Sequence, residues 1–181
     1  MNRRDLLAAG IGMGLSIAGA PAIARSRSTR ARERTLSLHH LHTDERLTLT
    51  YRIDERYQRS ALQKLNHFLR DFRTGDVKTM DPRLFDLLHD VTGYLGHDGG
   101  VFEVIGGYRS PRTNAMLRRT STGVARNSLH MTGQAMDIRL AQTPTRLIRD
   151  AALSLSRGGV GYYPKSDFVH VDTGRVRHWG A

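Results

Sequence analysis

The 181-residue chain contains no cysteine. Disulfide bonds are therefore excluded, and any metal site has to be built from histidine and carboxylate side chains. Structural zinc sites usually contain cysteine, so a zinc site without cysteine would be typical of catalysis. The chain has no internal repeat and no apolar run long enough for a comfortable membrane span. A repeat array and an integral membrane protein are thus not expected.

The first residues have the features of an export signal. Arg3-Arg4 precede a short Gly- and Ala-rich apolar run at 11–20, and Ala22-Ile23-Ala24 offers the small residues that a signal peptidase reads. Paired arginines before a weakly hydrophobic core are the twin-arginine signature. We expect residues 1–24 to be a twin-arginine signal peptide and the mature protein to lie in the periplasm. A short retained membrane anchor is the alternative.

Acidic residues are few in comparison with basic ones. The chain has 17 Asp and Glu against 28 Lys and Arg, which gives a formal net charge of +11. Such a balance favours an acidic partner. For an exported protein this points to anionic cell-wall polymer or lipid head groups rather than nucleic acid. Residues 25–34 hold part of this charge and are expected to be a solvated linker.

The remaining residues, 35–181, predict one α+β domain with a mainly antiparallel central sheet flanked by helices. Strands and helices are mixed without regular βαβ alternation. Apolar residues alternate over 36–53, as in a hairpin with one buried face. Helical spacing is expected over three long stretches, and short strands over four others. The expected helices are 54–72, 81–95 and 143–155, with a short one at 111–119, and the expected strands are 101–105, 134–140, 160–163 and 168–173.

Two histidines and a carboxylate stand at spacings that suit a catalytic zinc, which takes three protein ligands and leaves one position open. His130 comes at the end of a loop, and Gly133 lets the chain turn sharply after it. In the strand that follows, Asp137 stands on the face opposite the apolar residues. His170 lies in the last expected strand. If these side chains converge, the chain is a metallohydrolase.

The chain resembles a known family in three segments. These are Gly107-Tyr108-Arg109-Ser110-Pro111, Ser128-x-His130-x-x-Gly133-x-Ala135-x-Asp137 and Asp167-Phe168-Val169-His170-Val171-Asp172. In this order they resemble the zinc peptidases of the D-Ala-D-Ala metallopeptidase superfamily, which shares its fold with hedgehog signalling domains. Within that group, the chain is most similar to the twin-arginine-exported periplasmic murein endopeptidases of the YcbK/MepK type.

The resemblance implies a role for each matching residue. His130, Asp137 and His170 would bind Zn²⁺, Arg109 would steady the oxyanion of the tetrahedral intermediate, and Asp167 would be the general base. In a regular strand, Asp167 and a residue three positions later lie on opposite faces, so Asp167 would have to precede the strand. Asp172 is the alternative base, although a role in orienting a ligand suits it better.

The resemblance also implies an activity. We expect a zinc-dependent murein endopeptidase that hydrolyses peptide cross-links of peptidoglycan. A D,D- or L,D-carboxypeptidase on the same scaffold and a non-catalytic peptidoglycan-binding protein are the alternatives. His178 and Tyr108 are candidates for contact with the substrate, whereas His39, His40 and His42 are expected to be surface or packing residues. The oligomeric state is left open.

Overall fold

The computed structural model describes residues 31–97 and 99–180. The expected signal peptide at 1–24 and most of the expected linker at 25–34 lie outside these residues, so their assignment stays a prediction. In the described part of the chain, no helix has both the length and the apolar character needed to cross a membrane.

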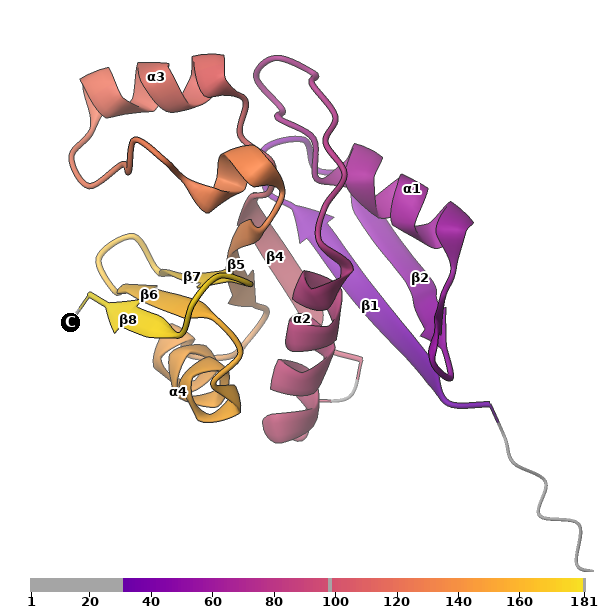
Figure 1. Cartoon of the computed structure of the whole chain (residues 1–181). Coiled ribbons are helices and arrows are strands. Elements are labelled where there is room, and N and C mark those ends of the chain that lie inside the picture. Colours follow the sequence, from indigo (N-terminus) through magenta and orange to yellow (C-terminus); the bar gives the residue numbers. More distant parts are fainter. Residues whose placement is uncertain (1–30, 98, 181) are drawn as a thin grey trace, which may run out of the picture. The chain divides into compact units, whose positions relative to one another are not determined.

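The described part contains eight strands, four α-helices and a short 3-10 helix, η1 (Figure 1). The strands are β1 (Glu33–His40), β2 (Arg46–Ile53), β3 (Arg56–Tyr57), β4 (Val101–Gly106), β5 (Ala135–Leu140), β6 (Gly159–Tyr163), β7 (Phe168–Asp172) and β8 (Arg177–Trp179). The helices are α1 (Arg59–Phe68), α2 (Pro82–Tyr94), α3 (Pro111–Thr120), η1 (Leu129–Thr132) and α4 (Thr145–Leu155). The mixed α+β class expected from the sequence is confirmed.

All eight strands form one sheet in the order β3-β2-β1-β4-β5-β7-β6-β8. Most neighbours are antiparallel, and only the pairs β1–β4 and β6–β8 are parallel. The prediction of a mainly antiparallel sheet is therefore correct. β5 lies between β4 and β7 in the middle of the sheet, so the residues that it carries are flanked by strands on both sides.

One face of the sheet forms the hydrophobic core. Helices α1, α2 and α4 pack against this face, and Figure 1 shows α3 set apart from them. Along β5, Met136, Ile138 and Leu140 are almost fully buried in this core. Because side chains alternate along a strand, Asp137 points to the other face. The core thus fixes the position of β5 and leaves Asp137 free for chemistry.

Local sequence signals explain where two of the helices begin. The side chain of Asp81 accepts a hydrogen bond from the backbone N–H of Arg83 at the start of α2, and Ser110 does the same for Thr113 at the start of α3. In each case the next residue is proline, which suits the first turn of a helix. Ser110 also donates its own backbone N–H to buried Asp71 at 2.9 Å. This contact holds the start of α3 against the core.

The expected boundaries are wrong in a few places. The helix expected at 54–72 begins only at Arg59, because residues 56–57 pair with the end of β2 as the short strand β3. The final strand β8 was not expected, and it pairs in parallel with β6. A strand of three residues has no alternation long enough to be recognised in a sequence. It matters because Arg177 and Trp179 border the site described next.

Candidate metal centre

His130 is held by a turn that its neighbours define. The side chain of Ser128 accepts a hydrogen bond from the backbone N–H of His130 at the start of η1. Gly133 ends η1 with a φ of 73°, in the left-handed region. This conformation disfavours any residue other than glycine. In addition, a Cβ at Gly133 would lie 2.4 Å from the carbonyl oxygen of Thr79, which is too close for any side chain. The sharp turn expected at Gly133 is therefore present, and it leads directly into β5.

The pairing of β5 with β7 brings Asp137 and His170 together. These residues are direct partners in the antiparallel register. Side chains at such positions project from the same face with Cβ atoms about 4.5–5.5 Å apart. His130 reaches the same point from η1. Its side chain is 3% exposed, and those of Asp137 and His170 are both 11% exposed.

The donor atoms of these three residues have the spacing of a tetrahedral metal site. His130 Nε2 lies 3.2 Å from His170 Nδ1 and 3.3 Å from Asp137 Oδ1. His170 Nδ1 lies 2.9 Å from the same oxygen. Bonds of about 2.0–2.1 Å to zinc would place tetrahedral ligands about 3.3 Å apart. The described residues contain a single group of this kind, and its donor set of two imidazoles and one carboxylate fits Zn²⁺.

The opposite nitrogen of each histidine is bound by the protein. His130 Nδ1 lies 2.7 Å from the carbonyl oxygen of Gly107, and His170 Nε2 lies 3.1 Å from Asp172 Oδ2. Both partners are acceptors, so each of these nitrogens carries the hydrogen and donates it. In the neutral imidazoles that a metal binds, His130 Nε2 and His170 Nδ1 then present a lone pair on the side of Asp137. Such support of metal-binding histidines fixes both the tautomer and the ring orientation.

Asp172 is the most constrained carboxylate of the site. It is fully buried and accepts hydrogen bonds from the backbone N–H groups of Gly159 and Gly174. The guanidinium of Arg177 donates to both of its oxygens, at 3.0 and 2.7 Å. The orienting role expected for Asp172 agrees with this position behind His170. A base that acts on water in the cleft would need a free oxygen, and Asp172 has none.

Electrostatics keep Asp137 ionised at the centre of the cluster. Burial raises the pKa of Asp137, but the interactions with His130 and His170 outweigh burial and hold that pKa well below its usual range. Burial lowers the pKa of His170, but hydrogen bonds with Asp137 and Asp172 outweigh it and raise the pKa to about 9. Two carboxylates therefore attract a positive charge to His170. A divalent cation would satisfy the same carboxylates in exchange for the proton.

A cleft of about 520 Å³ opens above the cluster. Arg109 lies in it, with Nη2 3.6 Å from Asp137 Oδ2, and burial lowers the pKa of this guanidinium. The structure thus brings Arg109 together with the three candidate ligands. The cleft is lined by Arg109, Ser121, Thr122, Gly123, Val124, Ala125, Asn127, Ser128, Leu129, His130, Asp137, Tyr163, Ser166, Phe168, His170, Arg177 and Trp179.

Asp167 is not brought to the cluster. Its two carboxylate oxygens accept hydrogen bonds from Thr145 at 3.0 Å and from Arg139 at 3.1 Å, and none of these three residues lines the cleft. Asp167 has a φ of 51°, a left-handed conformation that Asp, Asn and Gly adopt most readily. It precedes β7, as expected, but the turn directs its side chain away from His170.

An aromatic wall along one side of the cleft was missed by the sequence analysis. The indole N–H of Trp179 donates to the hydroxyl of Tyr163 at 2.8 Å, and the Trp179 ring lies 5.2 Å from the His170 ring. His178 and Tyr108, the candidates for contact with the substrate, do not line the cleft. In β8, alternation sends His178 outward and Trp179 inward, and only the unexpected strand pairing could have indicated this.

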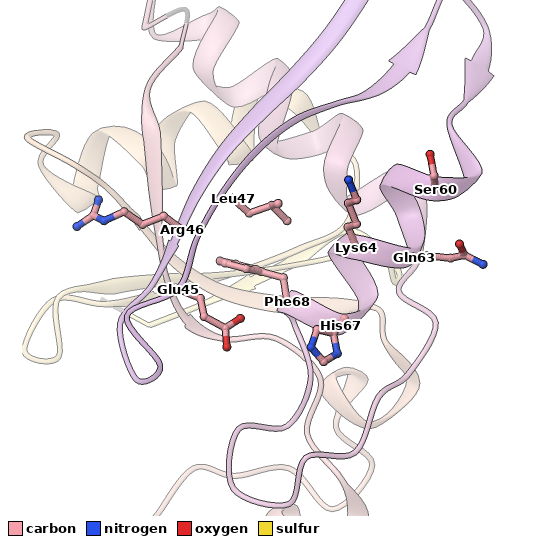
Figure 2. A pocket seen from close by; sticks show the side chains of 8 residues that line it. All are labelled: Glu45, Arg46, Leu47, Ser60, Gln63, Lys64, His67 and Phe68. Atoms are coloured by element: carbon pink, nitrogen blue, oxygen red, sulfur yellow. The ribbon is translucent and has the colours of Figure 1, made fainter.

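A second hollow, of about 550 Å³, lies between α1 and the start of β2 (Figure 2). Its charged lining residues include Arg46, Lys64 and Glu45, and Glu45 forms an ion pair with Arg70. None of the candidate ligands belongs to it. It shares no lining residue with the cleft above the metal centre.

The chain matches a known protein family and is similar in sequence to several proteins of known name. The family model described as peptidoglycan L,D-endopeptidase MepK matches residues 28–179. Peptidoglycan L,D-endopeptidase MepK of Escherichia coli strain K12 is 47% identical over 178 residues, covering 98% of this chain and 97% of that protein. The protein of the same name from Shigella flexneri gives the same figures. Probable peptidoglycan L,D-endopeptidase MepK of Haemophilus influenzae is 46% identical over 144 residues, covering 80% and 77%. No solved structure matches the chain.

Proposed function

The chain belongs to the peptidoglycan L,D-endopeptidase MepK family, and from this premise we propose that it is a zinc-dependent endopeptidase. Its substrate would be the L,D-peptide bond in cross-linked stem peptides of peptidoglycan. The cluster of His130, Asp137 and His170 supports the proposal most directly, because three donor atoms at tetrahedral spacing lie at the floor of a cleft. Members of this family of metallopeptidases share the substrate class, and the metal identity is our inference from the donor set.

Zinc, when bound, would supply a Lewis acid that activates water and polarises a peptide carbonyl. His130 Nε2, Asp137 Oδ1 and His170 Nδ1 would hold it. Gly107 and Asp172 keep the two imidazoles in the tautomers that this requires. No rearrangement of the three side chains is needed, which lowers the cost of organising the site.

Arg109 would stabilise the transition state. Its guanidinium is largely buried beside Asp137, at the edge of the donor cluster. A substrate carbonyl oxygen bound above the cluster would come within reach of its N–H groups. A fixed positive charge at that position stabilises negative charge that develops only as the carbonyl is attacked. Asp167 has no part in this proposal, because its carboxylate is bound to Arg139 and Thr145 outside the cleft.

The proposal is tested with purified muropeptides. Cross-linked dimers are incubated with the wild type and with His130→Ala, with and without a chelator, and the products are identified by mass. We expect cleavage of the cross-link by the wild type, loss of cleavage with chelator or substitution, and recovery when Zn²⁺ is restored to the wild type. Release of a terminal amino acid alone would instead indicate a carboxypeptidase. Binding without cleavage would indicate a non-catalytic protein.

We further propose that the protein is exported to the periplasm by the twin-arginine pathway. Arg3 and Arg4 at the start of the chain support this proposal. Replacement of both by lysine should leave the protein in the cytoplasm. Fractionation followed by detection of the protein in each compartment measures the effect, and normal export of the double variant would contradict the proposal.

A further inference from the structure

The segment that walls the cleft carries no acidic residue. Between Glu103 and Asp137 the chain has five arginines and no Asp or Glu. Arg109 lies in the cleft, and the other four are exposed. We call these four the arginine wall: Arg112, Arg118 and Arg119 on α3, and Arg126 in the loop that follows.

The arginine wall is built into the border of the cleft. The loop between α3 and η1 supplies much of the cleft lining through residues 121–125 and Asn127, whereas the four arginines are not among the lining residues. The side-chain amide of Asn114 on α3 donates hydrogen bonds to the carbonyl oxygens of Ala125 and Arg126 at 3.1 and 3.4 Å. α3 and the loop are thereby tied together. Positive charge on either segment therefore lies beside the cleft and acts on an entering ligand through space rather than from the lining.

These charges are not neutralised by partners. Within residues 31–97 and 99–180, no guanidinium of the arginine wall forms an ion pair or a side-chain hydrogen bond. In contrast, Arg34, Arg52 and Arg139 each form salt bridges with carboxylates elsewhere in the domain. A free guanidinium keeps all five of its donors for an anion.

The rest of the cleft does not offset the positive charge of the arginine wall. Tyr163, Phe168 and Trp179 add uncharged aromatic rings to the lining, and the guanidinium of Arg177 is bound to buried Asp172. Asp137 is the one carboxylate among the lining residues, and it is engaged by His130 and His170. An excess of charge of one sign around a cleft concentrates ligands of the opposite sign and speeds their binding. The cleft is thus suited to an anionic substrate.

We propose that the arginine wall selects substrates that carry free carboxylates where the peptide extends out of the cleft. This inference rests on the proposed function, since stem peptides of peptidoglycan are the anionic molecules that would enter this cleft. Carboxylates and guanidinium groups form strong charge-assisted hydrogen bonds. Stem peptides whose carboxylates are converted to amides would lose this attraction and be cleaved more slowly.

The test compares two versions of one cross-linked stem peptide, with its side carboxylates either free or amidated. At low ionic strength we expect the wild type to cleave the free form with a kcat/KM about tenfold higher. The preference should shrink as salt is added, because exposed charges are screened. In the variant with Arg112, Arg118, Arg119 and Arg126 all replaced by Gln, both peptides should be cleaved at the rate of the amidated one, with kcat retained.

A matched control removes the same charge at the other end of the sheet. Arg46, Arg56, Arg59 and Lys64 are exposed and lie on β2, β3 and α1. Arg46 and Lys64 border the hollow of Figure 2. β2 is three strands away from β5, about 14 Å at the usual strand spacing. Replacing these four residues by Gln should leave the preference for the free peptide intact.

Several outcomes would overturn the inference. One is equal cleavage of both peptides by the wild type, and another is a preserved preference in the arginine-wall variant. Loss of binding to phosphatidylglycerol vesicles with unchanged cleavage would instead assign the wall to a membrane surface. If the variant does not fold, as judged by circular dichroism, the salt dependence of the wild-type preference decides.

Binding to purified sacculi separates this inference from the proposed function. Sacculi with intact carboxylates should bind the wild type more tightly than sacculi whose carboxylates were converted to amides. If this difference is found but neither peptide is cleaved, the arginine wall recognises carboxylates and the proposed endopeptidase activity is wrong. If both peptides are cleaved and the wild type binds both kinds of sacculi with equal affinity, the proposed activity stands and the inference is wrong.

Discussion

Replacing Asp172 by Asn should weaken metal binding, although Asp172 would not touch the metal. Asp172 accepts hydrogen bonds from His170, Arg177, Gly159 and Gly174, and all four partners present donors. Asn has nearly the same shape but can accept through one atom only. Three of the donors converge on Oδ1, so the amide oxygen belongs there and the amide N–H₂ group then faces His170 Nε2.

This change reverses the histidine tautomer. Facing a donor, His170 Nε2 has to become an acceptor, and the hydrogen moves to Nδ1. Nδ1 is the atom that lies 3.2 Å from His130 Nε2 and 2.9 Å from Asp137 Oδ1. A protonated nitrogen cannot bind a metal. Loss of such an outer partner weakens metal binding by roughly 10- to 100-fold, or about 1.4 to 2.7 kcal/mol.

The assay is competition for Zn²⁺ with a chromogenic chelator at one neutral pH, repeated for Asp172→Asn and for a control, Asp150→Asn. The side chain of Asp150 is half exposed on α4 and pairs only with its neighbour Arg149, while its backbone carbonyl accepts a hydrogen bond from the hydroxyl of Ser154. The control should bind Zn²⁺ as the wild type does. Unchanged affinity in Asp172→Asn would refute the tautomer argument. If that variant does not fold, Arg177→Gln removes one anchor of Asp172 and should lower the affinity by less than tenfold.

Three further predictions concern other parts of the domain. Gly133→Ala should destabilise the fold by at least about 1 kcal/mol, because the left-handed φ and the close carbonyl of Thr79 both oppose a Cβ; an unchanged Tm would contradict this. Burial lowers the pKa of His40 to about 4, below its unfolded value of 6.5, so the unfolded state takes up the proton first and stability falls as the pH drops through this window. We expect a loss of about 2 kcal/mol between pH 7 and pH 5, measured by urea unfolding, and little pH dependence from this site in His40→Leu. Asp167→Asn should keep kcat within a few-fold of the wild type, because Asn tolerates the left-handed turn and its side chain lies outside the cleft; a loss of 100-fold or more in steady-state hydrolysis would restore Asp167 as the general base.

Much of the fold could be predicted because its patterns are local. Alternation in β1 and β2 and the Asp81-Pro82 signal at the start of α2 each lie within a few residues. The short strands β3 and β8 could not be predicted, since their pairing partners rather than their own residues make them strands. The aromatic wall of the cleft was missed for the same reason.

The sequence alone determined which side chains are available as metal ligands. It lacks cysteine, it places Asp137 on the strand face opposite the core, and its three characteristic segments indicate the family. These properties are local or compositional, so no knowledge of long-range contacts was needed.

Only the tertiary structure decided how these candidate metal ligands are brought together. The register of β5 against β7 sets Asp137 opposite His170, while Gly107 and Asp172 select the imidazole tautomers. The turn at Asp167 sends that carboxylate to Arg139 instead of the cleft. Except for His170 and Asp172, which lie two residues apart on β7, these contacts join segments that are separate in the chain. A shift of one residue in strand register would have moved the side chains to the opposite face.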